Sequence, residues 1–235
     1  DPPLLGQRRR RQHPLERRGV GAGLVEQQPE DYETLYSLAL LNMEMEALDE
    51  ARRIFSRMLD VGYRNNDSRF FMGFIHEKEG EINAAIGQYR LVQMDSPNYL
   101  NAQRQVIRLL VSQGRLDEAH QWAGQLVSGQ PRLETLFITL EAEALMAEGE
   151  TERAGMLLNE AIERKPADTD LLFARTLWHE QRGDLAAAEA DLRQIITLEP
   201  NNARALNHLG YSLADRTDRY EEALALIEQA IALEP

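Results

Sequence analysis

The stretch LNAQRQVIRLLVSQGRLDEAHQWAGQLVSGQP, residues 100–131, decides the fold. Its apolar residues recur at intervals of three and four, the spacing of an α-helix with one buried face. We predict one helix over residues 100–113 and a second over residues 116–128, with a turn at Gly114-Arg115, because glycine readily takes the left-handed backbone that ends a helix. The residues predicted to face inward are Val106, Ile107 and Leu110 in the first helix and Ala119, Trp122, Ala123 and Leu126 in the second.

The same unit recurs along the chain in steps of 34 or 35 residues. A proline ends each unit because it cannot continue a helix, an alanine 12 residues earlier lets two helices cross closely, and a glycine marks the turn. The equivalent residues are Pro29, Pro97, Pro131, Pro166, Pro200 and Pro235, with Tyr63 in the one missing place; Ala51, Ala85, Ala119, Ala154, Ala188 and Ala223; and Gly80, Gly114, Gly149 and Gly183. The residues predicted to cap a following helix are Asp31, Asn98, Asp168 and Asn201.

Some positions depart from the pattern. Gln103, Glu141 and Arg175 stand where the other units have apolar residues. We therefore expect the first helix of those units to be rotated slightly.

A period of 34 residues, built as helix, turn and helix, resembles the tetratricopeptide repeat (TPR). The last unit carries the family pattern best, and residues Met72-Gly73, Ala85 and Tyr89 carry it in the second. The resemblance implies an all-α, right-handed α-α superhelix of six helix-turn-helix repeats, at about 30–63, 64–97, 98–131, 132–166, 167–200 and 201–235. The matching residues of the last unit are Leu206, Leu209, Gly210, Ala223, Ile227, Ala230 and Pro235.

The two ends of the chain differ from the repeats. Residues 1–28 hold six arginines, three acidic residues and several glycines and prolines, and we expect a poorly ordered leader there. Arg8 to Arg11 could touch anionic partners, but a solvated tail is the preferred interpretation. Because a solenoid needs a polar cap and none follows, we expect Leu224, Ile227 and Ile231 to be partly exposed and the chain to be part of a longer array.

Composition excludes several classes of function. The net charge of −13 disfavours nucleic acid as a partner of the repeats. The chain has no cysteine, so it has no disulfide and no thiolate metal site. Its five histidines form no zinc motif, because neither His76-Glu77 nor His179-Glu180 is followed by a second histidine at helical spacing. We predict no catalytic residues, no metal and no cofactor. The preferred function is a binding scaffold, and the competing hypothesis is an enzyme or a regulatory subunit.

Two stretches suggest a closer relationship. Residues 205–227, whose turn is one residue longer and lacks glycine, and residues 62–73 resemble TPR lipoproteins of the Gram-negative outer membrane. That resemblance implies a scaffold on the periplasmic side of the membrane, held by a lipid anchor outside this chain. It also implies an adaptor role, in which the partners are a carboxyl-terminal processing protease and its substrates. The alternative is a cytoplasmic TPR adaptor or a regulatory subunit of an enzyme complex; the oligomeric state stays open.

The TPR resemblance implies where a partner binds. The first helix of each repeat lines the concave groove with its second, fifth, sixth, ninth, twelfth and thirteenth positions. We predict that an extended or helical segment docks mainly in the groove of the second and third repeats. There Phe70, Phe71 and Phe74 lie beside Arg104 and Arg108 on successive repeats. The alternative is that Phe71 or Phe74 packs between those repeats and the arginines are solvated. The predicted groove residues are Tyr36, Phe70, Phe74, Arg104, Arg108, Glu143, Phe173, Asn207 and Tyr211.

Overall fold

The computed structural model describes residues 31–233, and the predicted leader at 1–28 lies outside them. The described residues form twelve α-helices and one short 3-10 turn, with no strand among them, so the all-α prediction is confirmed. None of the described helices is long and apolar enough to cross a membrane.

The chain divides into two compact units, and the boundary between them along the sequence falls within α6. The first unit, up to residue 105, contains α2 (Tyr32–Glu44), α3 (Leu48–Asp60), α4 (Asn65–Lys78), α5 (Ile82–Arg90) and the beginning of α6 (Tyr99–Ser112). The second unit contains the rest of α6, α7 (Leu116–Gly129), η1 (Pro131–Leu133), α8 (Glu134–Ala147), α9 (Thr151–Arg164), α10 (Thr169–Gln181), α11 (Leu185–Leu198), α12 (Ala203–Arg216) and α13 (Tyr220–Leu233).

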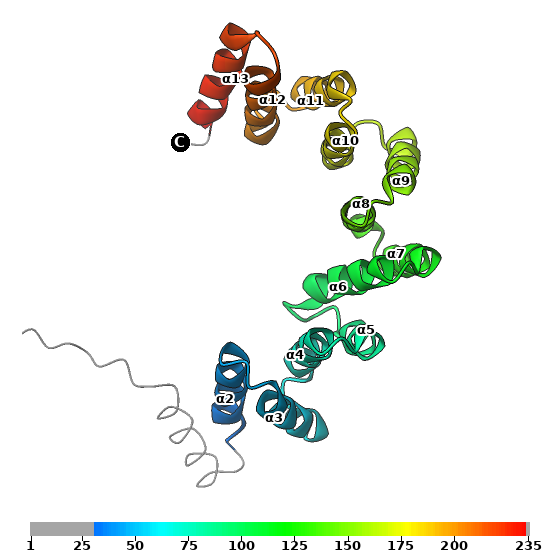
Figure 1. The fold of residues 1–235 in the computed structure, drawn as a ribbon, viewed down its shortest axis with the longest axis vertical. Coiled ribbons are helices and arrows are strands. Elements are labelled where there is room, and N and C mark those ends of the chain that lie inside the picture. Colours follow the sequence, from blue (N-terminus) through cyan, green and yellow to red (C-terminus); the bar gives the residue numbers. More distant parts are fainter. Residues whose placement is uncertain (1–30, 234–235) are drawn as a thin grey trace, which may run out of the picture. The chain divides into compact units, whose positions relative to one another are not determined.

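The helices follow one another as pairs (Figure 1). We call the first helix of each pair an A helix (α2, α4, α6, α8, α10 and α12) and the second a B helix (α3, α5, α7, α9, α11 and α13). Within the second unit, α8 and α10 lie on one side and α9 and α11 on the other. Each A helix of that unit from α8 onward packs against its own B helix, and α8 also contacts α10. Neighbouring A helices therefore present side chains to a common surface.

The recurring alanines lie in the core, as the pattern predicts. All six are at most 2% exposed. The glycines at the turns all have positive φ angles, from +69° at Gly114 to +83° at Gly149. In the first repeat Glu46 takes this place with φ of +57°. Local backbone geometry therefore repeats from unit to unit even where the residue differs.

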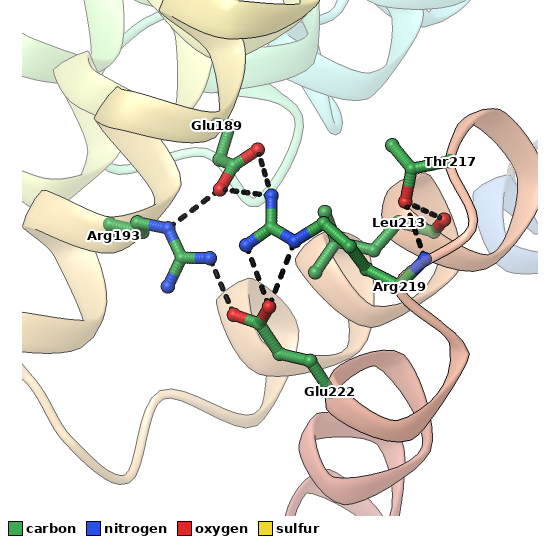
Figure 2. Close-up of polar contacts among 6 residues, drawn as sticks. All are labelled: Glu189, Arg193, Leu213, Thr217, Arg219 and Glu222. Atoms are coloured by element: carbon green, nitrogen blue, oxygen red, sulfur yellow. Dashed lines mark hydrogen bonds and ion pairs between the residues drawn. The ribbon is translucent and has the colours of Figure 1, made fainter.

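The turn of the last repeat is closed in another way. Thr217 has an extended backbone, with φ of −144°. Its hydroxyl donates to the Leu213 carbonyl at 2.6 Å and accepts from the Arg219 backbone N–H at 3.1 Å. These two bonds, drawn in Figure 2, replace the left-handed conformation of the other turns.

One of the predicted helix caps needs correction. The side chain of Asn202, not Asn201, caps α12 by accepting from the Ala205 N–H at 2.9 Å, because the helix begins at Ala203. Asp31 and Asp168 cap α2 and α10 as predicted. Asn98 lies directly before α6, and its side-chain amide donates to Asp67 at 3.0 Å.

The polar residues at apolar positions stay in the interior instead of being turned away from it. Gln103 and Glu141 are buried. The Arg175 guanidinium binds the buried Asp191 carboxylate through two contacts, of 2.9 and 2.7 Å. Asp191 gives Arg175 a polar partner in the core, which a period-based argument cannot anticipate.

Candidate protein-binding surface on the A helices

All nine residues of the predicted groove lie on A helices. Phe74, Arg104, Glu143, Asn207 and Tyr211 are exposed, Tyr36, Phe70 and Arg108 are half-buried, and Phe173 is buried. Each unit presents its own part of this surface.

In the first unit, Tyr36 belongs to a cluster of aromatic and charged groups. The Arg64 guanidinium lies 4.7 Å from the centre of the Tyr36 ring, and it binds Glu33 at 3.0 Å and Asp67 at 3.3 Å. The hydrogen bonds of Arg64 with Glu33, and then with Tyr63 and Asp67, raise its pKa, so its charge is fixed. Partial burial raises the pKa of Tyr36, so its hydroxyl stays neutral. The cluster offers a flat aromatic surface next to a permanent cation.

The phenylalanines of α4 divide between core and surface. The Phe71 ring stacks on Phe55 at 5.2 Å and lies 6.4 Å from Tyr36, so Phe71 is a packing residue. Phe70 lies 5.7 Å from the Tyr89 ring. Phe74 is 37% exposed, with the Lys78 ammonium 5.4 Å from its ring centre. Exposed aromatic residues beside cations are typical of interface hot spots.

The predicted docking point of Phe74 and Arg108 takes one residue from each unit. Phe74 belongs to the first unit and Arg108 to the second. Their pairing therefore stays a prediction.

In the second unit, α8, α10 and α12 enclose a cavity of about 310 Å³. Its lining comes from equivalent positions of the three A helices. Second positions supply Leu136, Asp170 and Arg204, fifth positions Thr139 and Phe173, and ninth positions Glu143 and Leu177; Arg132, Thr135 and Ala174 complete the lining. We call this cavity the A-helix groove.

A stacked arginine forms one wall of the A-helix groove. The Arg204 guanidinium lies 3.5 Å from the centre of the Phe173 ring, and the His208 ring meets the same phenylalanine edge-on at 5.3 Å. These neighbours leave Phe173 only 7% exposed. A guanidinium stacked on a ring keeps its N–H groups at the edge, where they can bind a carboxylate in two places. Phe173 therefore acts as a platform for Arg204 more than as a contact of its own.

Charges are distributed unevenly along the A-helix groove. Arg132 precedes α8 and Arg204 is in the first turn of α12, whereas Glu143 is in the last two turns of α8. Asp170 adds a carboxylate in the first turn of α10. Apolar groups of Leu136 and Leu177 also contribute to the lining. The groove can therefore bind apolar side chains and opposite charges at different points of one segment.

Asn207 and Tyr211 continue along α12 outside the residues that line the cavity. Arg132 and Arg204 were missing from the predicted site. Arg204 occupies the second position of its helix, so applying the whole set of groove positions would have found it. Arg132 precedes its helix, and no periodic signal marks it.

One cluster in residues 31–233 has the geometry of a metal site. Ligand atoms of His76, Glu79 and Glu81 lie within 4.8 Å of one another. Protein groups already account for the arrangement, because His76 Nδ1 lies 2.6 Å from Glu81 and Glu79 pairs with Arg52. His179 and Asp184 repeat the His76–Glu81 contact at 3.8 Å in a later turn. The cluster is a turn-closing contact rather than the basis for a catalytic proposal.

Comparison with known proteins identifies the repeat. Residues 171–235 match a family model described as tetratricopeptide repeat. A crystal structure of a tetratricopeptide repeat protein from Parabacteroides merdae has a TM-score of 0.50 and 16% identity, covering 94% of this chain and 87% of that one. The chain therefore carries tetratricopeptide repeats and has their fold.

Two curated relatives extend the comparison. A TPR repeat-containing protein of Pseudomonas aeruginosa is 39% identical over 168 residues, covering 72% of this chain and 28% of that protein. Cellulose synthase 2 operon protein C of Komagataeibacter xylinus is 27% identical over 216 residues, covering 84% of this chain and 16% of that protein. The chain thus spans less than a third of the length of either relative.

Proposed function

We propose that this tetratricopeptide-repeat chain is a non-catalytic scaffold that binds a segment of a partner protein along its A helices. The tetratricopeptide fold is consistent with such a role. The observation that carries the proposal is the A-helix groove, where equivalent positions of three repeats line one cavity and Arg204 is held on Phe173. Anchoring by a stacked arginine and nearby apolar groups is how interface hot spots are built.

The finer proposal concerns the partner. We propose an adaptor on the periplasmic side of the outer membrane that brings substrates to a carboxyl-terminal processing protease, the full protein being held by a lipid anchor outside this chain. Support comes from the resemblance of residues 62–73 and 205–227 to outer-membrane TPR lipoproteins. The 39% identical relative from Pseudomonas aeruginosa, a Gram-negative bacterium, is compatible with that source.

An affinity pull-down tests both the scaffold proposal and the protease-adaptor proposal. The 235-residue chain is immobilised, exposed to a Gram-negative periplasmic extract, and the retained proteins are identified by mass spectrometry. We expect a processing protease among them, and we expect its recovery to fall about tenfold or more with Arg204→Glu. Arg216→Glu is the matched control, because Arg216 is on the same helix but outside the groove lining.

The outcomes distinguish the scaffold proposal from the protease-adaptor proposal. Retention of some other protein, lost with Arg204→Glu and kept with Arg216→Glu, would support the scaffold and reject the protease. Retention from a cytoplasmic extract alone would favour the cytoplasmic adaptor. Equal retention by both variants would reject the A-helix groove as the binding surface.

A further inference from the structure

A second groove lies among α7, α8 and α9, within the second unit. Cavities of about 190 Å³ and 180 Å³ share His120, Glu141, Leu157 and Glu160 in their linings, so they adjoin. The buried residues Phe137, Ile138 and Leu145 of α8 contribute apolar surface, and α8 also supplies the carboxylates of Glu134 and Glu141. The remaining lining comes from α7 and α9. We call this the B-helix groove.

The unusual feature of the B-helix groove is the carboxylate of Glu141, whose side chain is only 6% exposed. Residues eight before each turn glycine are equivalent, and at this position the second and third repeats have the buried apolar residues Met72 and Val106. The fifth repeat has Arg175, which binds Asp191 of its own repeat. The fourth repeat has Leu157 in the place equivalent to Asp191, so Glu141 lacks that partner.

Within residues 31–233, His120 is the one hydrogen-bond partner of the Glu141 carboxylate. Its Nδ1 lies 3.1 and 3.3 Å from the two carboxylate oxygens, but its side chain is 65% exposed. Burial raises the pKa of Glu141, and the charges of His120 and then Arg153 oppose that shift only in part. Replacing a buried charge by an apolar residue is often neutral or stabilising. Stability therefore gives no reason for a carboxylate here.

The cations at the rim of the B-helix groove are already paired. Arg153 binds Asp117 at 2.6 Å. Arg164 binds Glu160 at 2.7 Å and Glu134 at 3.4 Å. Among the described residues, the Glu141 carboxylate therefore has one contacting partner, the exposed His120, and no cation of the rim binds it directly.

The walls of the B-helix groove leave space for a side chain of a partner protein. Met156 lines it with 72% of its surface exposed, and methionine adapts its shape to a partner. Gly124 lies in the middle of α7, where a Cβ atom would meet nothing within 4 Å. Glycine at that position costs helix stability, and the packing within the chain does not require it. Met156 and Gly124 therefore leave space in the cavities that Glu141 also lines.

We propose that the B-helix groove is a second docking surface, which binds an arginine side chain of a partner protein with its stem along Leu145, Leu157 and Met156 and its guanidinium on Glu141. A guanidinium matches a carboxylate through two parallel N–H donors, and the arginine stem is apolar enough to lie on such walls. His120 moves aside into solvent as the arginine enters. The B-helix groove and the A-helix groove have different lining residues, so an experiment can reject the proposal for one groove without rejecting the proposal for the other.

Methyl NMR on the full 235-residue chain tests the proposal. The probe is the acetylated and amidated peptide Ala-Leu-Ala-Ala-Arg-Ala-Ala-Leu-Ala, and its control has citrulline, which is uncharged and nearly the same shape, in place of arginine. We expect the arginine peptide to shift the methyl resonances of Met156, Leu157 and Leu145. We expect binding to be weaker by about tenfold or more in two cases: the citrulline peptide with the unaltered chain, and the arginine peptide with the Glu141→Gln variant.

Glu150→Gln is the matched control variant, because Glu150 is exposed and outside the groove lining. It should bind the arginine peptide as the unaltered chain does. Three results would overturn the proposal: no shift at these methyl groups, shifts of equal size with citrulline, or shifts that persist in Glu141→Gln. Circular dichroism of Glu141→Gln establishes that the variant is folded before its binding is judged.

Discussion

At the scale of single residues, burial of a lone carboxylate makes stability depend on pH. Burial raises the pKa of Glu141 above its ordinary value of 4.5, so the folded chain holds that proton more tightly than the unfolded chain. The contribution of this group is most favourable below its ordinary pKa and is lost as pH rises through the raised pKa. At neutral pH the ionised carboxylate is therefore a cost to folding.

We expect Glu141→Gln to raise the melting temperature at about pH 8 and to change it much less at about pH 4.5. The comparison is made by differential scanning calorimetry in one buffer series. Glu160→Gln serves as the control, since Glu160 is an exposed residue of the same groove. A loss at about pH 8 would show that the native state stabilises the charged form, and a gain that is the same at both pH values would show that ionisation of Glu141 is not its cause.

Two helical glycines give opposite expectations on substitution by alanine. A Cβ at Gly210 would lie 2.6 Å from Ile227 and 3.0 Å from the Ala223 carbonyl oxygen, and backbone cannot move aside cheaply. Gly210→Ala should therefore destabilise the chain by about 1–3 kcal/mol. Gly124→Ala, where the space is open, should stabilise it by about 0.5–1 kcal/mol. Urea unfolding of both variants measures the difference, and equal midpoints would contradict the close packing of α12 on α13.

At the scale of helices, four charged side chains join α11 to α13 (Figure 2). Arg219 binds both Glu189, at 2.9 Å, and Glu222, at 2.6 Å. Arg193 binds the same two carboxylates, at 2.8 and 2.5 Å. Hydrogen bonds from Arg193 and then Arg219 lower the pKa of Glu222, which keeps the cycle charged. A network of this kind is worth more than isolated surface pairs.

Arg219→Gln should lower the melting temperature at low salt, and the loss should shrink in about 1 M NaCl, because salt screens exposed charges. Arg53→Gln provides the comparison, since Arg53 and Glu50 form an exposed pair. We expect almost no change from that variant at either salt concentration. If Arg219→Gln were equally harmless, or if its effect did not depend on salt, the cycle would not contribute electrostatically to the α11–α13 contact.

The helices themselves could be predicted because each depends on residues near it in sequence. Apolar spacing located both helices of the unit at residues 99–129, and the turn glycines located their ends. The pairings of buried polar groups could not be predicted in this way. Arg175 and Asp191 are 16 residues apart, and His120 and Glu141 are 21 apart, so only the packing of helices shows that they meet.

At the scale of the molecule, repetition explains both the fold and the candidate surfaces. Stability of such an array is close to a sum of repeat and neighbour contributions, so side chains on the outer surfaces of the helices are free to vary. The A-helix groove uses equivalent positions of successive repeats, and the residue types at those positions give it its charges. Sequence located the A helices and several of these positions, but it could not show that Phe173 lies beneath Arg204.

The central claim is that a partner protein binds along the A helices. Hydrogen–deuterium exchange of the chain, alone and in complex with the protein it retains from the extract, measures this most directly. We predict slower exchange in α10 and α12 within the complex, and loss of that protection with Arg204→Glu. Unchanged exchange in α10 and α12 while the complex remains intact would contradict the account.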